Sequence, residues 1–132
     1  MDMENLSEEQ VLQRLLAADS IPEKTIGLKR IGIPITIRGL TSKMVSSIRE
    51  RCTERNTKRG TEHVNEEMFN MALISAATVK PNWNDPQLLI KYSASSGEEV
   101  IKRILLAGEL DALGNAVLDL SGFGTELEEV KN

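Results

Sequence analysis

This chain of 132 residues has few of the residue types on which most metal sites and covalent cross-links depend. It has one cysteine, Cys52, and one histidine, His63. A single cysteine excludes an intramolecular disulfide and a cysteine-cluster zinc site, and it favours a reducing, cytoplasmic setting. The carboxylates are scattered, with neither EF-hand nor zinc spacing. We therefore expect no metal and no cofactor.

Neither of these two residues has the neighbours that catalysis requires. His63 lies beside Glu62 in a polar segment, without a nucleophile elbow or a third group to orient it. Cys52 falls on the apolar line of a predicted helix, which favours a buried thiol over a thiolate activated by Arg51 and Arg55. No glycine-rich loop is followed by the lysine and serine of a phosphate site. The sequence thus predicts a protein that is not an enzyme.

Long apolar runs are also missing, and none approaches the roughly 18 residues of a membrane span. The first ten residues, MDMENLSEEQ, are acidic and polar where a secretory signal would be basic and then apolar. We expect a protein that neither spans a membrane nor is exported. Because aromatic residues make up only 3% of the chain, aliphatic residues and methionine must fill its core.

The charge balance argues against a general polyanion binder, since the net charge is -4. One segment, residues 38–59, carries seven positive charges against Glu50 and Glu54, and it is the only feature that favours nucleic acid. It lacks aromatic residues that could stack on bases, and the two glutamates can pair with neighbouring arginines. We therefore expect no nucleic acid, and an acidic protein surface or the chain's own acidic tail fits this segment better.

The first third of the chain predicts a helix and then a hairpin. Ser7 and Gln10 form a capping box, and apolar residues repeat behind it, so a helix is expected over residues 7–18. From residue 24 to residue 38 isoleucine and leucine alternate with polar or small residues around Gly32, which is typical of a β-hairpin. Pro34 lacks an N–H, which places the second strand at an edge or orients that position outward.

The rest of the chain predicts helices. Thr41 begins an arginine-rich helix that Gly60 ends, and a polar loop leads to a helix capped by Asn65. Apolar residues cover more than half of the Asn65 helix, so we expect it to be central. Asp85 followed by Pro86 predicts a short helix, and Ser96 caps another that continues until Gly108, where we expect a kink or a break between two helices.

The last predicted helix carries an apolar stripe and a defined end. The run from Leu105 to Phe123 has apolar residues at spacings of four and three, and Gly122 can end the helix in a Schellman cap. We predict a single domain over residues 1–124 and a flexible acidic tail over 125–132. The expected fold class is α+β and mostly α-helical, with the N-terminal helix and the hairpin packed on a cluster of four or five helices.

Three stretches read in order resemble the XkdN-like phage tail assembly chaperones of Gram-positive phages and prophages. They are the hairpin segment IPEKTIGLKRIGIPITIRGLT, which leads into the arginine-rich helix, the pair MFNMALISAATVKPNW and DPQLLIKY, and the closing run LLAGELDALGNAVLDLSGF. The resemblance covers about residues 21–123.

The resemblance implies a non-enzymatic role in the cytoplasm of the bacterial host. A protein of this family is expected to bind the tape measure protein and keep it soluble while the tail tube protein polymerises around it. The family also implies a possible homo-oligomer and a longer frameshifted form, which would diverge from this chain after Gly124. The alternative is another phage structural or adaptor protein-interaction module.

A chaperone of a helical, apolar client requires a surface that accepts amphipathic helices. The sequence offers apolar residues on two predicted helices as partner-binding candidates. For each of them the alternatives are a place in the core or a contact with a second copy. The candidates are Leu106, Leu110, Leu113, Val117, Met68 and Met71.

Overall fold

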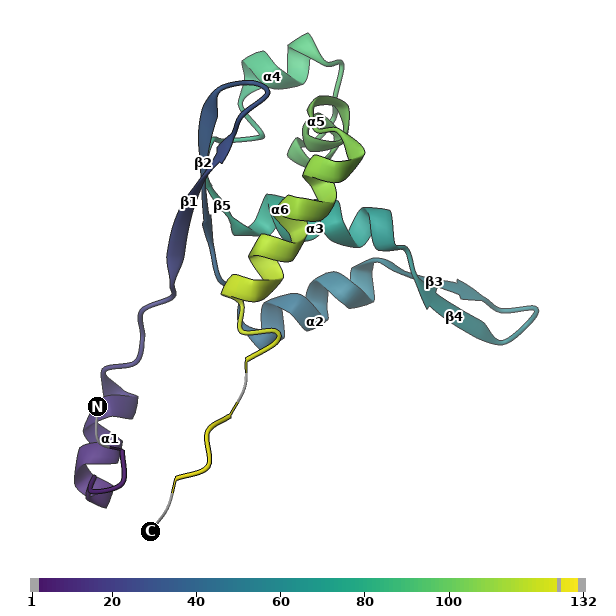
Figure 1. The fold of residues 1–132 in the computed structure, drawn as a ribbon. Coiled ribbons are helices and arrows are strands. Elements are labelled where there is room, and N and C mark those ends of the chain that lie inside the picture. Colours follow the sequence, from purple (N-terminus) through teal and green to yellow (C-terminus); the bar gives the residue numbers. More distant parts are fainter. Residues whose placement is uncertain (1–2, 126, 131–132) are drawn as a thin grey trace.

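The computed structural model describes residues 3–125 and 127–130, and these form an α+β fold of six helices and two antiparallel sheets (Figure 1). The helices are α1 (Glu8–Leu16), α2 (Ser42–Arg51), α3 (Glu66–Ala77), α4 (Pro86–Lys91), α5 (Gly97–Ile104) and α6 (Ala107–Leu120). The strands are β1 (Glu23–Leu28), β2 (Ile33–Arg38), β3 (Thr53–Asn56), β4 (Thr61–Val64) and β5 (Thr78–Lys80). None of the described helices is long and apolar enough to cross a bilayer.

The predicted hairpin is confirmed as β1 and β2, which pair in antiparallel register with Ile26 opposite Ile35. A third strand, β5, was not predicted, and it makes β2 the central strand of the sheet. It pairs with β2 only at Thr36 and Ile37, beyond Pro34. The sequence allowed two explanations for Pro34, an edge strand or an outward-facing position. Because β2 is the central strand, the edge-strand explanation is wrong. Pro34 is exposed, and its missing N–H costs no hydrogen bond to β5.

Helix α3 is central, as predicted. Its Asn65 cap accepts a hydrogen bond from the Met68 N–H at 3.1 Å. Apolar residues on several sides of α3 let it contact α2, α5, α6 and β2 at once. Leu73, Ile74 and Ala77 have no exposed surface. The core therefore forms around this helix, and the isoleucine face of the sheet covers one side of it.

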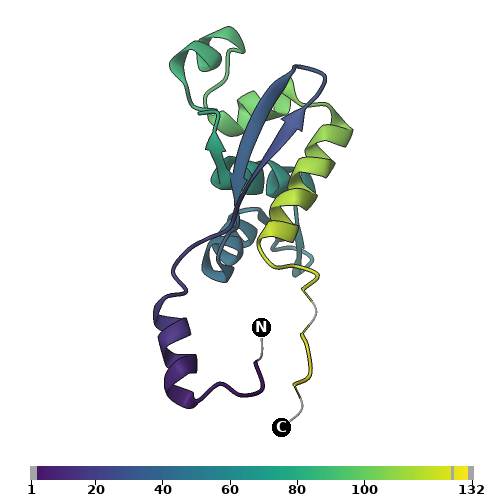
Figure 2. The same ribbon diagram turned by 60° about the vertical axis from the view of Figure 1, so that its left-hand side comes forward.

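Helix α1 forms as predicted but does not pack as predicted. The capping box is present, because Ser7 Oγ accepts from the Gln10 N–H and Gln10 Oε1 accepts from the Ser7 N–H. No α1 residue is buried, and Leu15 and Leu16 are each 68% exposed. Figures 1 and 2 show α1 apart from the other helices. The expected packing of this helix on the cluster is therefore wrong.

A second hairpin, β3 and β4, replaces the polar loop that the sequence predicted. Helix α2 ends at Arg51, so the prediction that Gly60 ends it is wrong. Gly60 instead has a φ of 65° in the hairpin turn, where Asn56 Oδ1 accepts from the N–H groups of Lys58 and Arg59. A glycine with positive φ suits a turn as well as a helix end, and this ambiguity explains the error.

Helices α4 and α5 begin at the predicted caps, Asp85 and Ser96. The predicted break near Gly108 is present, but it falls at Leu105 and Leu106, and Gly108 lies in the first turn of α6. Helix α6 ends in the expected Schellman motif. The N–H groups of Gly122 and Phe123 donate to the carbonyls of Asp119 and Leu118, each at 3.1 Å.

The predicted tail, residues 125–132, lies only partly within the described residues. Thr125 and residues 127–130 form no helix or strand, whereas 126 and 131–132 lie outside the described residues. The flexibility of this tail and the single domain over residues 1–124 stay predictions.

Candidate interaction surface

The structure separates the six predicted partner-binding residues into two groups. Met71, Leu113 and Val117 lie in the core. Leu106 and Met68 are 57% and 39% exposed, and Leu110 is half-buried. In this structure only the second group offers apolar surface to a partner.

The close approach of α6 to α3 causes this separation. Gly114 lies between Leu113 and Val117 on the buried side of α6. A Cβ atom on Gly114 would stand 2.5 Å from Asn70 Oδ1 of α3, so the two helices meet where α6 has no side chain. This contact buries the middle of the predicted stripe and leaves its first turn, with Leu106, at the surface.

An apolar cleft, which we call the hairpin cleft, lies between the turn of the β1–β2 hairpin and the first half of α6. Its volume is about 430 Å³. Ile26 and Leu28 contribute because they lie on the same face of the sheet as Ile35, towards α6. None of the six partner-binding candidates predicted from the sequence belongs to the hairpin, so its contribution to this cleft was not predicted. The residues that line it include Ile26, Leu28, Lys29, Leu105, Ala112 and Leu113.

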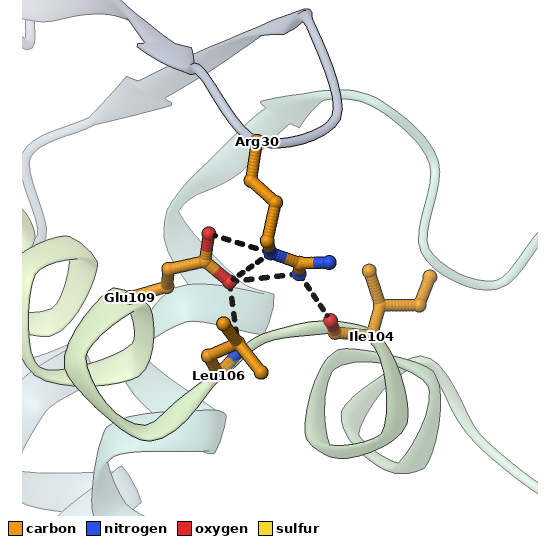
Figure 3. Close-up of polar contacts among 4 residues, drawn as sticks. All are labelled: Arg30, Ile104, Leu106 and Glu109. Atoms are coloured by element: carbon orange, nitrogen blue, oxygen red, sulfur yellow. Dashed lines mark hydrogen bonds and ion pairs between the residues drawn. The ribbon is translucent and has the colours of Figure 1, made fainter.

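An ion pair between Arg30 and Glu109 holds the hairpin turn against α6 beside this cleft (Figure 3). Arg30 Nη2 donates to Glu109 Oε1 at 2.8 Å and to the Ile104 carbonyl at 2.7 Å, and Arg30 Nε donates to both carboxylate oxygens. Glu109 Oε1 also accepts from the Leu106 N–H at 2.8 Å. One carboxylate therefore caps α6 and fixes the hairpin turn.

These hydrogen bonds keep Glu109 ionised. The Arg30 guanidinium, followed by the Leu106 N–H, lowers the pKa of the Glu109 carboxyl below its ordinary value. The two side chains are 79 positions apart in the sequence. No local pattern could have paired them, although Glu109, three residues after the helix cap, is at a capping position.

A second concave surface, the α3–α6 groove, lies on the other side of Leu105. Its volume is about 520 Å³, and its apolar part comes from Leu105, Ala107 and Leu110. Charged residues of both signs also line it, and Lys102 Nζ lies 3.5 Å from Glu67 Oε1. Since Leu105 lines both concavities, they adjoin at the α5–α6 junction.

The chain matches a protein-family model. The model described as the phage XkdN-like tail assembly chaperone protein matches residues 12–132, nearly the whole chain. The chain belongs to this family. The resemblance carried by the hairpin, the central helix and the closing run is therefore confirmed, and the family suggests a non-enzymatic role.

A solved structure shares the fold of this tail assembly chaperone family member. The crystal structure of the protein YqbN has a TM-score of 0.59 and 18% sequence identity, over 93% of this chain and 98% of YqbN. At this identity the likeness shows the fold alone. No match was found among curated proteins.

The two residues that could have suggested catalysis lie apart from both concavities in this family member. His63 is on β4, with Nε2 3.0 Å from Glu54 Oε2 and most of its side chain exposed. Cys52 is 1% exposed, and its burial raises the pKa of the thiol. Among the residues described, no group of three or more histidine, cysteine or acidic side chains could hold a metal ion.

Arginines of the basic segment are used largely for internal contacts. The Arg49 guanidinium stacks over the Phe69 ring at 5.1 Å from its centre, which joins α2 to α3. Arg51 Nη2 lies 3.0 Å from Glu98 Oε1 of α5, and Arg55 pairs with Glu50 and with Glu62. The arginine-rich pattern thus serves packing around α2 and the second hairpin.

Proposed function

We propose that this tail assembly chaperone binds the tape measure protein of its phage and keeps it soluble in the bacterial cytoplasm while the tail tube protein assembles around it. The observation that supports this proposal is the pair of concavities on either side of Leu105, one apolar and one both apolar and charged, with Leu106 exposed beside them. Family membership supplies the tail assembly role, and these surfaces supply a place for a helical client.

The two concavities suit an amphipathic helix. Such a helix presents apolar residues at every third or fourth position, which fit a groove that is apolar at its base and charged at its rim. The α3–α6 groove offers both kinds of residue, because Leu105, Ala107 and Leu110 line it together with Lys102 and Glu67. Leu106 is exposed at the start of α6, next to Leu105 and Ala107, so it extends the apolar surface available to a client. Met68 is exposed on a different side of α3 from the groove residues Glu67 and Asn70.

Co-expression with the tape measure protein tests the proposal. The wild-type chain should raise the soluble fraction of the tape measure protein, and Leu106→Asp should lower that gain several-fold. Ile90→Asp is the matched control, because Ile90 is 79% exposed on α4 and no α4 residue lines either concavity, whereas Leu106 directly follows Leu105, which lines both. Both variants should keep the wild-type circular dichroism spectrum. An unchanged soluble yield with the wild-type chain would remove the proposal.

The alternative is a phage structural or adaptor module that stays in the virion. It predicts the chain in purified tails and no effect on the solubility of the tape measure protein. Mass spectrometry of tails separates the two functions.

Mass spectrometry of infected cells tests for a longer, frameshifted form. Peptides of that form would share this chain up to about Gly124 and then differ.

A further inference from the structure

The second hairpin, residues 53–64, contributes almost nothing to the core. Val64 is its one apolar residue, and it packs half-buried at the base of the hairpin. Residues 54–63 are all exposed, and the hairpin projects from the body between α2 and α3 (Figure 1). Because it has no apolar face to remove from water, a partner of this hairpin must be recognised by polar contacts.

Contacts at its base hold the hairpin in a fixed direction. Glu54 Oε1 accepts from Asn65 Nδ2 at 2.8 Å, and the Asn65 N–H donates to the Cys52 carbonyl at 2.9 Å. The Arg55 guanidinium pairs with Glu50 of α2. An isolated two-stranded hairpin is marginally stable in water, so these contacts with α2 and with the cap of α3 support it and orient it.

Pairing within the hairpin leaves two positive charges at its tip. Both of its glutamates are paired, one with His63 and one with Arg55, each at 3.0 Å. Lys58 and Arg59 form no ion pair with any residue that the structure describes. Their backbone is held in place, because Asn56 Oδ1 accepts from both of their N–H groups. The tip therefore presents two cations on an ordered turn.

A polar concavity of about 400 Å³ adjoins Lys58 on the hairpin. It combines the Lys58 ammonium with the Thr57 hydroxyl and the Asn56 amide, all of which donate hydrogen bonds. Donors next to a positive charge are the groups that recognise a carboxylate. The residues that line the concavity are Glu54, Arg55, Asn56, Thr57, Lys58 and His63.

The length of the hairpin separates its tip from an acidic molecule. The whole chain has a net charge of -4, whereas residues 53–64 carry three positive and two negative charges. Each strand has four residues, which span about 13 Å, and the Debye length at physiological ionic strength is about 8 Å. Repulsion between the body and an acidic partner is therefore largely screened when that partner contacts only the tip.

We propose that the second hairpin docks an acidic segment of a partner protein, whose carboxylates bind Lys58 and Arg59 at the tip. The hairpin has no aromatic side chain on which a base could stack, which favours an acidic protein segment over a nucleic acid. None of its residues lines the hairpin cleft or the α3–α6 groove. The contact is therefore additional to the surfaces assigned to the tape measure protein.

Titration of the isotope-labelled chain with a hexaglutamate peptide, followed by nuclear magnetic resonance, tests this contact. Saturable shifts should be confined to residues 54–63. The double variant Lys58→Gln and Arg59→Gln should weaken binding about ten-fold. The control, Lys80→Gln with Lys91→Gln, removes two exposed positive charges from β5 and α4 and should bind like the wild type. Absence of binding, or equal weakening in both double variants, would overturn the proposal.

Two further titrations separate the hairpin from other sources of binding. A chain in which Asn-Gly replaces residues 54–63 should show no shifts with the peptide, and persistent binding would place the site elsewhere and contradict the proposal. Hexathymidylate, a nucleic acid of similar charge, should bind the wild-type chain more weakly than hexaglutamate. Tighter binding of hexathymidylate would make the hairpin a nucleic-acid site, which also contradicts the proposal. The tape measure protein is absent from these experiments, so their failure leaves its own test unaffected.

Discussion

At the scale of single residues, a few contacts between distant positions hold the hairpin to the helices. Arg30 and Glu109 join one end of the hairpin to the start of α6. At the other end, Ser121 Oγ accepts from the Leu40 N–H at 2.8 Å and donates to the Val117 carbonyl at 2.7 Å. Both contacts satisfy backbone groups at the ends of α6, so they fix helix and sheet together.

Gly39 should be intolerant of a side chain. A Cβ atom there would lie 2.7 Å from the Leu120 carbonyl oxygen, and this backbone atom cannot move aside without shifting α6. Gly39→Ala should lower the free energy of unfolding by about 1–3 kcal/mol, measured by urea denaturation. Gly27→Ala is the control, because nothing lies within 4 Å of its Cβ position. Equal midpoints for the two variants would contradict this account.

The Arg30–Glu109 pair should make stability depend on acid pH. The folded pKa of Glu109 is lower than its ordinary value, so the stabilisation is present above that value and is lost as pH falls through the folded pKa. Arg30→Gln removes the largest cause of the lowered pKa. The urea midpoint should therefore fall less between pH 7 and pH 3 in Arg30→Gln than in the wild type, and parallel losses in both proteins would refute the assignment.

At the scale of elements, α6 has two roles along its length. Its first turn is exposed at the α5–α6 junction, and its middle packs on α3 in the core. The periodic stripe that looked continuous in the sequence is therefore divided by the helices around it. The second hairpin, in contrast, projects from the body with most of its residues exposed (Figure 1).

Substitutions with aspartate should distinguish the two parts of α6. Leu113→Asp places a charge at a core position that is 5% exposed, and it should cost about 4 kcal/mol or more or unfold the protein. Leu106→Asp, at the exposed end, should change the free energy of unfolding by about 0.5 kcal/mol or less. Thermal unfolding followed by circular dichroism gives both values; a folded, stable Leu113→Asp would show that α6 does not pack as described.

The second hairpin should be dispensable for the fold. Thr53 pairs with Val64 at its base, so residues 54–63 can be replaced by Asn-Gly, a two-residue turn that suits antiparallel strands. Because these residues are exposed, the melting temperature should change by only a few degrees. A large loss would mean that the ion pair between Arg55 and Glu50 stabilises α2 more than its exposure suggests.

At the scale of the whole molecule, the chain is a compact body with a helix attached at its N-terminal side. Helix α1 is joined to the body by residues 17–22 and contributes nothing to the core. The fold of the body thus does not depend on α1, and the apolar face of α1 remains available for an intermolecular contact.

Removal of residues 1–18 should therefore leave the stability of the body unchanged. The truncated chain and the full chain should melt within a few degrees of each other, measured by calorimetry. A much lower melting temperature for the truncated chain would mean that α1 packs on its own body in solution.

Local features were predictable from the sequence because local interactions determine them. The caps at Ser7, Thr41 and Asn65 and the Schellman end at Gly122 depend on residues three to five apart. The alternation of the first hairpin and the dense apolar pattern of α3 were equally clear. The order of these elements also carried the resemblance to the XkdN-like family.

The tertiary structure alone decided which apolar residues are surface. Leu106 and Leu113 belong to one apolar stripe, yet only Leu113 is buried. Leu15 lies on an apolar helix face of the kind that usually packs in a core, yet no described element covers it. The cleft between Ile26 and Ala112, and the ion pair beside it, join segments about 80 residues apart. Burial is a property of what packs against a residue, and a periodic sequence specifies the face of a helix but not the partner of that face.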